Sequence, residues 1–215
     1  HALSFWASVE SNIQNKTQGV EFINLPHKED LFRSSGYTGF SAVYGDSRTV
    51  HRPDGEWDQL LNDYCFGKLN KPIWGIGETG FHGDDKIDYI HNVLFLKEFN
   101  KKAAFDALRK GRLYAIWGNK NEVVLADFSI GDSQTNKIAY MGDELDATDK
   151  VDIHISGHRS AGSQGTVIIR LIKNGEVIES FESKDEKFEF QIRDDVPRDR
   201  NKSFYRLLIN GPSEI

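Results

Sequence analysis

The spacing of apolar residues changes near Gly118, and this change constrains the fold more than any other feature of the chain. After Gly118, apolar and other residues alternate at period two, a pattern that predicts strands with one buried face. The alternating runs are Val124 to Ile130, Val151 to Ile155, Val167 to Leu171 and Phe188 to Ile192, with a last strand expected from Ser203 to Ile209. We therefore predict that residues 119–215 form an all-β immunoglobulin-like sandwich.

The dipeptide Asn174-Gly175 lies between two of the predicted strands. A two-residue type I′ turn needs positive φ at both central positions, and Asn and Gly tolerate positive φ best. The sequence therefore predicts a tight hairpin turn from Lys173 to Glu176.

The segment before Gly118 has a different rhythm, in which predicted strands alternate with predicted helices. One helix is indicated by apolar residues at helical spacing, and Asn100 is a suitable N-cap for another that ends at Gly111. The residues of the first helix are Trp57, Leu60, Leu61, Tyr64 and Cys65. The expected strands are Val20 to Ile23, Ile73 to Ile76, Asn92 to Leu96 and Leu113 to Trp117. This order is typical of an α/β layer or barrel.

Two expectations concern the start of the chain. Ser4 can cap a helix in which Trp6, Val9 and Ile13 recur at roughly helical spacing. Residues 27–55 are rich in Gly, Ser, Asp and Arg and are expected to be irregular. A segment of that length without regular structure is usually functional.

Composition restricts the classes of function. The chain has 215 residues, of which 38% are hydrophobic and 28% charged, values typical of a globular protein. Its net charge of −6 without a basic stripe argues against a nucleic-acid partner, and no apolar run reaches the roughly 20 residues of a membrane span. Cys65 is the one cysteine, which excludes a disulfide within the chain and a cysteine zinc cluster.

The stretch from Pro72 to Gly83 combines a short apolar strand with a glycine-rich turn. The turn carries a carboxylate, Glu78, and an imidazole, His82, just after the predicted strand. In α/β barrels the chemistry lies at the carboxyl ends of the strands, and the glycines permit a tight turn that aims both side chains inward. The alternative is an ordinary glycine loop with an exposed histidine.

Four segments, taken in order, carry a resemblance to a known family. They are His1-Ala2, Val20-Glu21-Phe22-Ile23-Asn24, Thr79-Gly80-Phe81-His82 and Ala107-Leu108-Arg109-Lys110-Gly111-Arg112-Leu113-Tyr114. In these segments the chain resembles the later part of a PHP domain, the polymerase and histidinol phosphatase superfamily. The resemblance implies that residues 1–118 form the C-terminal part of a PHP-type α/β barrel, to which the sandwich is appended.

The resemblance also implies a divalent-metal site of Zn, Mn or Mg at the strand ends. It assigns His1 and His82 as metal ligands, with Glu78, Glu21 and Asp84 as neighbours of the site. Gly80 stands where the family has a ligand Asp, and the His-x-His strand of the family has no counterpart because the chain begins after it. A glycine side chain cannot bind a metal, so the ligand set is incomplete unless a neighbouring carboxylate replaces that Asp.

Two functions follow from these observations. The first is a PHP-like metal-dependent hydrolase of phosphoesters or other small molecules, incomplete in this chain. The second is a non-catalytic protein, either a degenerate barrel or an interaction module whose sandwich binds a glycan or a protein partner. Catalytic residues and oligomeric state are not assigned by the sequence, and for the compartment we lean toward the periplasm or secretion.

Overall fold

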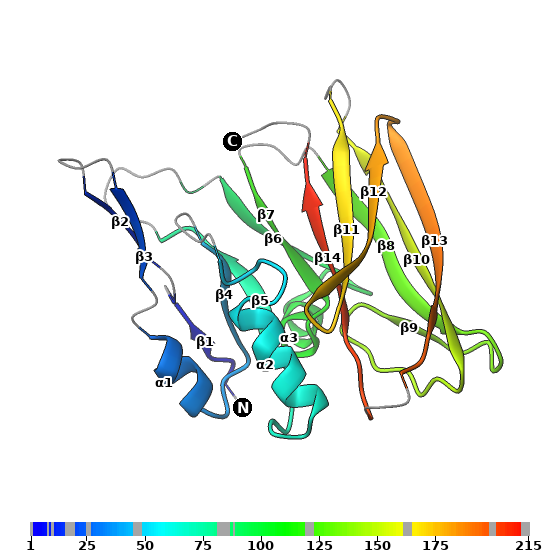
Figure 1. Cartoon of the computed structure of the whole chain (residues 1–215), viewed down its shortest axis with the longest axis horizontal. Coiled ribbons are helices and arrows are strands. Elements are labelled where there is room, and N and C mark those ends of the chain that lie inside the picture. The colour runs from blue at the N-terminus through cyan, green and yellow to red at the C-terminus, as the bar shows by residue number, and fades with distance from the viewer. Residues whose placement is uncertain are drawn as a thin grey trace.

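The structure is a computed structural model that describes residues 2–7, 9, 11–15, 20–24, 27–44, 49–80, 87, 89–118, 123–160, 165–197 and 201–211, without the side chains of 11–15 and 20–24. This part of the chain contains fourteen strands and three helices and is therefore mostly β-structure (Figure 1). The helices are α1 (Lys28–Arg33), α2 (Glu56–Cys65) and α3 (Lys101–Lys110). None of them is long and apolar enough to cross a bilayer.

Three small sheets make up the first part of the chain. Parallel strands in the order β1-β4-β5 form one sheet, and two antiparallel pairs, β2-β3 and β6-β7, form the others. The strands are β1 (Phe5–Trp6), β2 (Ser11–Asn15), β3 (Val20–Asn24), β4 (Gly39–Tyr44), β5 (Trp74–Glu78), β6 (Ile90–Leu94) and β7 (Leu113–Trp117). From β4 to β7 the order is strand, helix, strand, strand, helix, strand, so the predicted alternation holds except between β5 and β6.

The helix expected after Ser4 is wrong, because Phe5–Trp6 is a strand that pairs with β4 and Ser11–Asn15 is a second strand. The pairing of Phe5–Trp6 with β4 outweighs the weak local helical pattern, because tertiary context overrides local propensity. Residues 27–55 are likewise not irregular throughout, since they contain α1 and β4.

One hydrophobic cluster packs α1, β4 and α2 of the first part together. Three of its buried members, Leu31, Phe40 and Leu60, come from these elements, and each has at most 1% of its surface exposed. The rest of the cluster consists of Val9, Tyr37, Ala42, Val50 and Ile73, with Trp6, Phe32, Trp57 and Leu69 packed against it. The apolar residues of the segment predicted to be irregular are therefore core residues, although their spacing has no period.

The helices α2 and α3 form where the sequence predicts them. The apolar stripe of α2 is buried, with Leu60, Leu61 and Cys65 each less than 7% exposed. Asn100 caps α3, because its Oδ1 accepts a hydrogen bond from the Ala103 amide at 2.9 Å. Gly111 ends α3 in the left-handed conformation, with φ of 71°.

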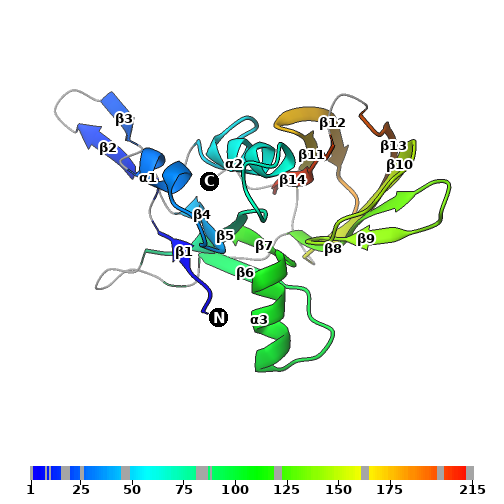
Figure 2. The same ribbon diagram turned by 90° about the horizontal axis from the view of Figure 1, so that it is seen from below.

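Two antiparallel sheets form the second part, in the orders β13-β10-β8-β9 and β12-β11-β14. Figure 2 shows them as two facing layers. The strands are β8 (Val123–Asp132), β9 (Ile138–Tyr140), β10 (Lys150–Arg159), β11 (Val167–Lys173), β12 (Glu176–Ser183), β13 (Lys187–Asp195) and β14 (Tyr205–Asn210). A cluster between the layers buries Ile155, Val167, Ile169 and Leu171 completely. The period-two alternation therefore predicts this β-structure of two layers correctly.

The turn between β11 and β12 has the backbone expected of a type I′ turn. Asn174 has φ of 54° and Gly175 has φ of 99°, and Lys173 pairs with Glu176 across the turn. A Cβ added at Gly175 would meet its nearest neighbour, an oxygen of Asp54, at an ordinary 3.5 Å. The need for glycine is therefore conformational rather than steric.

We expect Gly175→Val to lower the free energy of unfolding by more than about 1 kcal/mol, because a β-branched residue resists positive φ. Urea unfolding measures this. The control is Gly131→Ala in β8, where φ is not positive and a Cβ would have no neighbour closer than 3.7 Å. Equal stability of Gly175→Val and the wild type would show that the turn does not constrain the hairpin.

Candidate functional site

The carboxyl ends of β4 and β5 meet at one edge of the parallel sheet. Glu78, the last residue of β5, lies opposite Tyr44, the last residue of β4. The Ser41 hydroxyl of β4 hydrogen-bonds to Oε2 of Glu78 and lies 3.2 Å from the carbonyl oxygen of Trp6 in β1. A half-buried carboxylate is thus held at the strand ends by a neighbouring strand. We call Ser41, Tyr44, Glu78 and Gly80 the carboxyl edge.

Gly80 lies directly under the ring of Tyr44. Its φ is 63°, and an added Cβ would lie 2.4 Å from both Cε2 and the hydroxyl oxygen of Tyr44. A side chain at position 80 would therefore need a strained backbone and a displaced tyrosine ring. The space beside the backbone at this position is filled by Tyr44.

Asn92 connects β6 to β5 through its side-chain amide. The Gly77 amide donates to Oδ1 of Asn92 at 2.8 Å, and Nδ2 of Asn92 donates to the Gly77 carbonyl at 2.8 Å. Glycine is required at 77 because a Cβ would lie 2.6 Å from a methyl group of Ile90. The Tyr89 hydroxyl also donates to the Thr79 carbonyl at 2.8 Å. These contacts fix the segment that follows β5.

The structure describes only some of the residues predicted for the metal site. His1, His82 and Asp84 lie outside the described residues, and the side chain of Glu21 does as well, although its backbone belongs to β3. Glu78 is the predicted site residue whose side chain is described. In the part of the chain that the structure describes, no group of three or more His, Cys, Asp or Glu side chains is placed to hold a metal ion.

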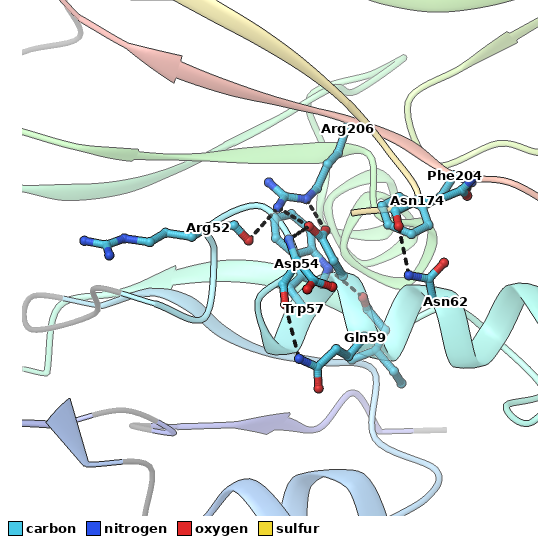
Figure 3. A network of polar contacts seen from close by, with 10 residues as sticks. Arg52, Asp54, Trp57, Gln59, Asn62, Asn174, Phe204 and Arg206 are labelled. Atoms are coloured by element: carbon cyan, nitrogen blue, oxygen red, sulfur yellow. Dashed lines mark hydrogen bonds and ion pairs between the residues drawn. The ribbon is translucent and has the colours of Figure 1, made fainter. Parts of the chain in front are cut away.

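A buried ion pair joins the first part of the chain to the second (Figure 3). Nη2 of Arg206, in β14, donates to Oδ2 of Asp58, in α2, at 2.7 Å, and Nε donates to Oδ1. The side chains are 7% and 0% exposed. Arg206 also donates to the Arg52 carbonyl at 3.1 Å, and its guanidinium lies 5.1 Å from the centre of the Trp57 ring. These partners of the Arg206 side chain lie in or just before α2.

The hairpin turn of the second part binds the same helix. Nδ2 of Asn62 donates to the Asn174 carbonyl at 3.0 Å, as Figure 3 shows. The Asn174 side chain in turn accepts from the Phe204 amide and donates to the Ser203 hydroxyl, at 3.2 and 3.1 Å. One residue therefore forms the turn and connects α2 to the start of β14.

A third contact between the parts is charged and lies at the surface. Lys202 donates to the Tyr64 hydroxyl at 2.6 Å and to Glu144 at 2.9 Å, and Tyr64 itself hydrogen-bonds to Glu144. The hydrogen bond from Tyr64 and the Lys202 ammonium lower the pKa of Glu144. Burial and the hydrogen bond to Glu144 raise the pKa of Tyr64. The cluster is therefore held as an ammonium paired with a carboxylate at neutral pH.

These contacts border a cavity of about 1990 Å³ between the two parts. Residues of α2, β7, β8 and β14 line it, together with the loop from 141 to 147. It is larger than the roughly 300–1,000 Å³ of a site that encloses a small ligand. The sequence gives no indication of this opening, because it arises from how distant segments meet.

A further polar cluster lies on the outer face of the four-stranded sheet. His154, in β10, has Nδ1 2.7 Å from Oδ2 of Asp127 and Nε2 3.0 Å from Oε1 of Glu189. The hydrogen bonds to Asp127 and then to Glu189 raise the pKa of His154. When it is protonated, this histidine bridges β8, β10 and β13.

Comparison with known proteins returns no match to the chain among family models, curated proteins or solved structures. The function is therefore argued from the contacts of the chain itself.

We expect the His154 bridge to stabilise the fold at low pH and to lose its effect as pH rises. Because the folded pKa is raised above the ordinary value near 6.5, the stabilisation is complete below that value and disappears through the folded pKa. The difference in melting temperature between wild type and His154→Gln should thus be largest near about pH 5.5 and smallest near about pH 8.5.

The control is His158→Gln, which changes an exposed histidine of the same strand. Its melting profile should parallel that of the wild type. A pH-independent difference for His154→Gln would mean that the histidine acts through packing and not through its charge.

Proposed function

We propose that the first part of the chain is PHP-like and that its carboxyl edge belongs to a metal-dependent hydrolase site for phosphoesters. The position of Glu78 carries this proposal. It is a carboxylate at the carboxyl end of a parallel strand, and Ser41 of the neighbouring strand holds it. The carboxyl ends of the strands are where α/β enzymes carry their functional groups.

Glu78 fits one ligand position of such a site. A carboxylate that accepts a hydrogen bond at one oxygen keeps further lone pairs, and hard cations prefer such oxygen donors. His82, His1 and Asp84 would have to complete the ligand set. A divalent metal, when bound, supplies Lewis-acid activation of water and neutralises phosphate charge. The role of the described residues is to hold Glu78 in place through Ser41, and to hold the backbone on either side of it through the bonds of Asn92 to Gly77 and of Tyr89 to Thr79.

A second candidate is a non-catalytic interaction protein, and the packing of Tyr44 favours it. The PHP ligand Asp corresponds to Gly80, and the tyrosine ring fills the space that such an Asp would need. On this hypothesis the carboxyl edge has lost its chemistry, and the second part of the chain carries the function.

We also infer that the second part is immunoglobulin-like. Its strands β8, β10 and β13 pair in the order of A, B and E, and β12, β11 and β14 in the order of C′, C and F. The crossing between layers after β10 and after β12 agrees with that assignment. Such sandwiches commonly serve as binding modules, which suits either candidate function.

Metal analysis of the dialysed chain tests the hydrolase proposal. Protein dialysed against Mn or Zn should retain metal weakly and below one equivalent, and Glu78→Gln or His82→Ala should reduce it further. His158→Ala is the matched control and should leave the metal content unchanged. A chain that binds no metal, or binds it equally in both site variants, would contradict the proposal and favour the second candidate.

The double variant Gly80→Asp with Tyr44→Ala sharpens the comparison. It supplies the missing carboxylate and removes the ring that occupies its place. If the site is PHP-like, the metal affinity should rise by about tenfold or more, which is about 1.4 kcal/mol or more of binding free energy, because a carboxylate is an added oxygen ligand for the metal. The single variant Tyr44→Ala should produce no such gain.

A further inference from the structure

The outer face of the sheet β13-β10-β8-β9 carries a groove of about 700 Å³. The strand register aligns four of its residues in one row. Tyr140 of β9 lies opposite Ser129 of β8, Ser129 opposite His154 of β10, and His154 opposite Gln191 of β13. The groove therefore runs across all four strands.

A second row lies two residues away on the same face. It consists of Ile138, Gly131, Asp152 and Arg193, again paired directly across the strands. Gly131 has no side chain, so the row of side chains is interrupted between Ile138 and Asp152. With strands about 4.8 Å apart and rows about 7 Å apart, the two rows cover roughly 14 by 7 Å. This is the footprint of a short oligomer of six-membered rings.

One end of the groove presents exposed apolar surface. Tyr140 is 57% exposed and Ile138 is 60% exposed, whereas Ala139 between them is buried. Tyrosine is enriched at binding interfaces, because its ring is a large flat apolar surface with a polar end. The tyrosine can thus support the apolar face of a ligand.

The polar side chains of the groove are already paired with one another. Arg193 donates to Asp152 at 2.7 Å. His154 lies between Asp127 and Glu189, and Ser129 donates to Asp127 at 2.7 Å. These bonds fix the side chains before any ligand arrives. Arg193 and a protonated His154 offset two of the three carboxylates, so one negative charge remains and the field of the groove disfavours an anion.

We propose that this outer face binds a neutral carbohydrate. A pyranose ring packs its C–H face on Tyr140, and neighbouring sugar hydroxyls hydrogen-bond to the Gln191 amide and to the remaining lone pairs of Asp127 and Asp152. Hydroxyl pairs of a sugar can both donate and accept, which suits a row of amide, hydroxyl and carboxylate groups. The site lies on the second part of the chain and does not depend on metal binding at the carboxyl edge.

Calorimetric titration of the full chain with cellohexaose, xylohexaose, mannohexaose and maltohexaose, each up to about 10 mM, tests the proposal. At least one of these neutral hexasaccharides should bind. Tyr140→Ala should weaken that binding by roughly tenfold or more, and Gln191→Ala by several-fold. Tyr140→Phe keeps the ring and should retain most of the affinity, which separates ring stacking from a folding defect.

Val177→Ala is the matched control, because Val177 is an exposed apolar residue of the opposite sheet, 42% exposed. The Val177→Ala protein should bind the same hexasaccharide with the affinity of the wild type, and its unchanged melting temperature should show that the fold is intact. Absence of binding to all four sugars would overturn the proposal. So would binding that survives Tyr140→Ala, or binding to heparin alone, which would indicate recognition by charge.

Discussion

The buried ion pair between Asp58 and Arg206 is the contact on which the arrangement of the two parts depends. Both charged groups are removed from water, so each requires the other, and the loss of one partner of such a pair costs about 3–5 kcal/mol. The pair does not stand alone, because the Arg52 carbonyl and the Trp57 ring also contact the guanidinium. A residue from near the end of the chain is thereby anchored to a helix of its first half.

The helix α2 connects the candidate sites of the molecule. Its apolar residues pack against the parallel sheet that carries Glu78, whereas Asp58, Asn62 and Tyr64 contact the second part. The second part is therefore placed relative to the carboxyl edge largely through α2, and the ion pair of Arg112 with Asp143 adds a contact beyond that helix. This makes independent folding of residues 119–215 an open prediction, since a fragment without α2 would leave the Arg206 guanidinium without Asp58 and Arg52.

Periodic features of the fold could be predicted from the sequence. The period-two runs predicted the strands of the second part, the Asn174-Gly175 dipeptide predicted its hairpin turn, and the apolar stripe predicted α2. Features that depend on contacts between distant segments could not. β1 becomes a strand because it pairs with β4. The residues around Asp58 show no pattern that indicates its partner, which lies 148 residues further along the chain. The one available signal was Arg206 itself, a charge inside the apolar run from Tyr205 to Ile209.

Urea unfolding followed by two probes tests the ion-pair account most directly. All four tryptophans, at positions 6, 57, 74 and 117, lie in the first part, so their fluorescence reports that part. Amide hydrogen exchange in β10 and β11, measured by mass spectrometry over the same urea series, reports the second. The two transitions should coincide in the wild type and separate in Asp58→Ala, with a loss of about 3–5 kcal/mol. The control is Asp63→Ala. Asp63 also lies in α2 but pairs with Lys68 near the surface, so its removal should lower the free energy of unfolding by about 1 kcal/mol or less. Separate transitions in the wild type, or an unchanged midpoint in Asp58→Ala, would contradict the account.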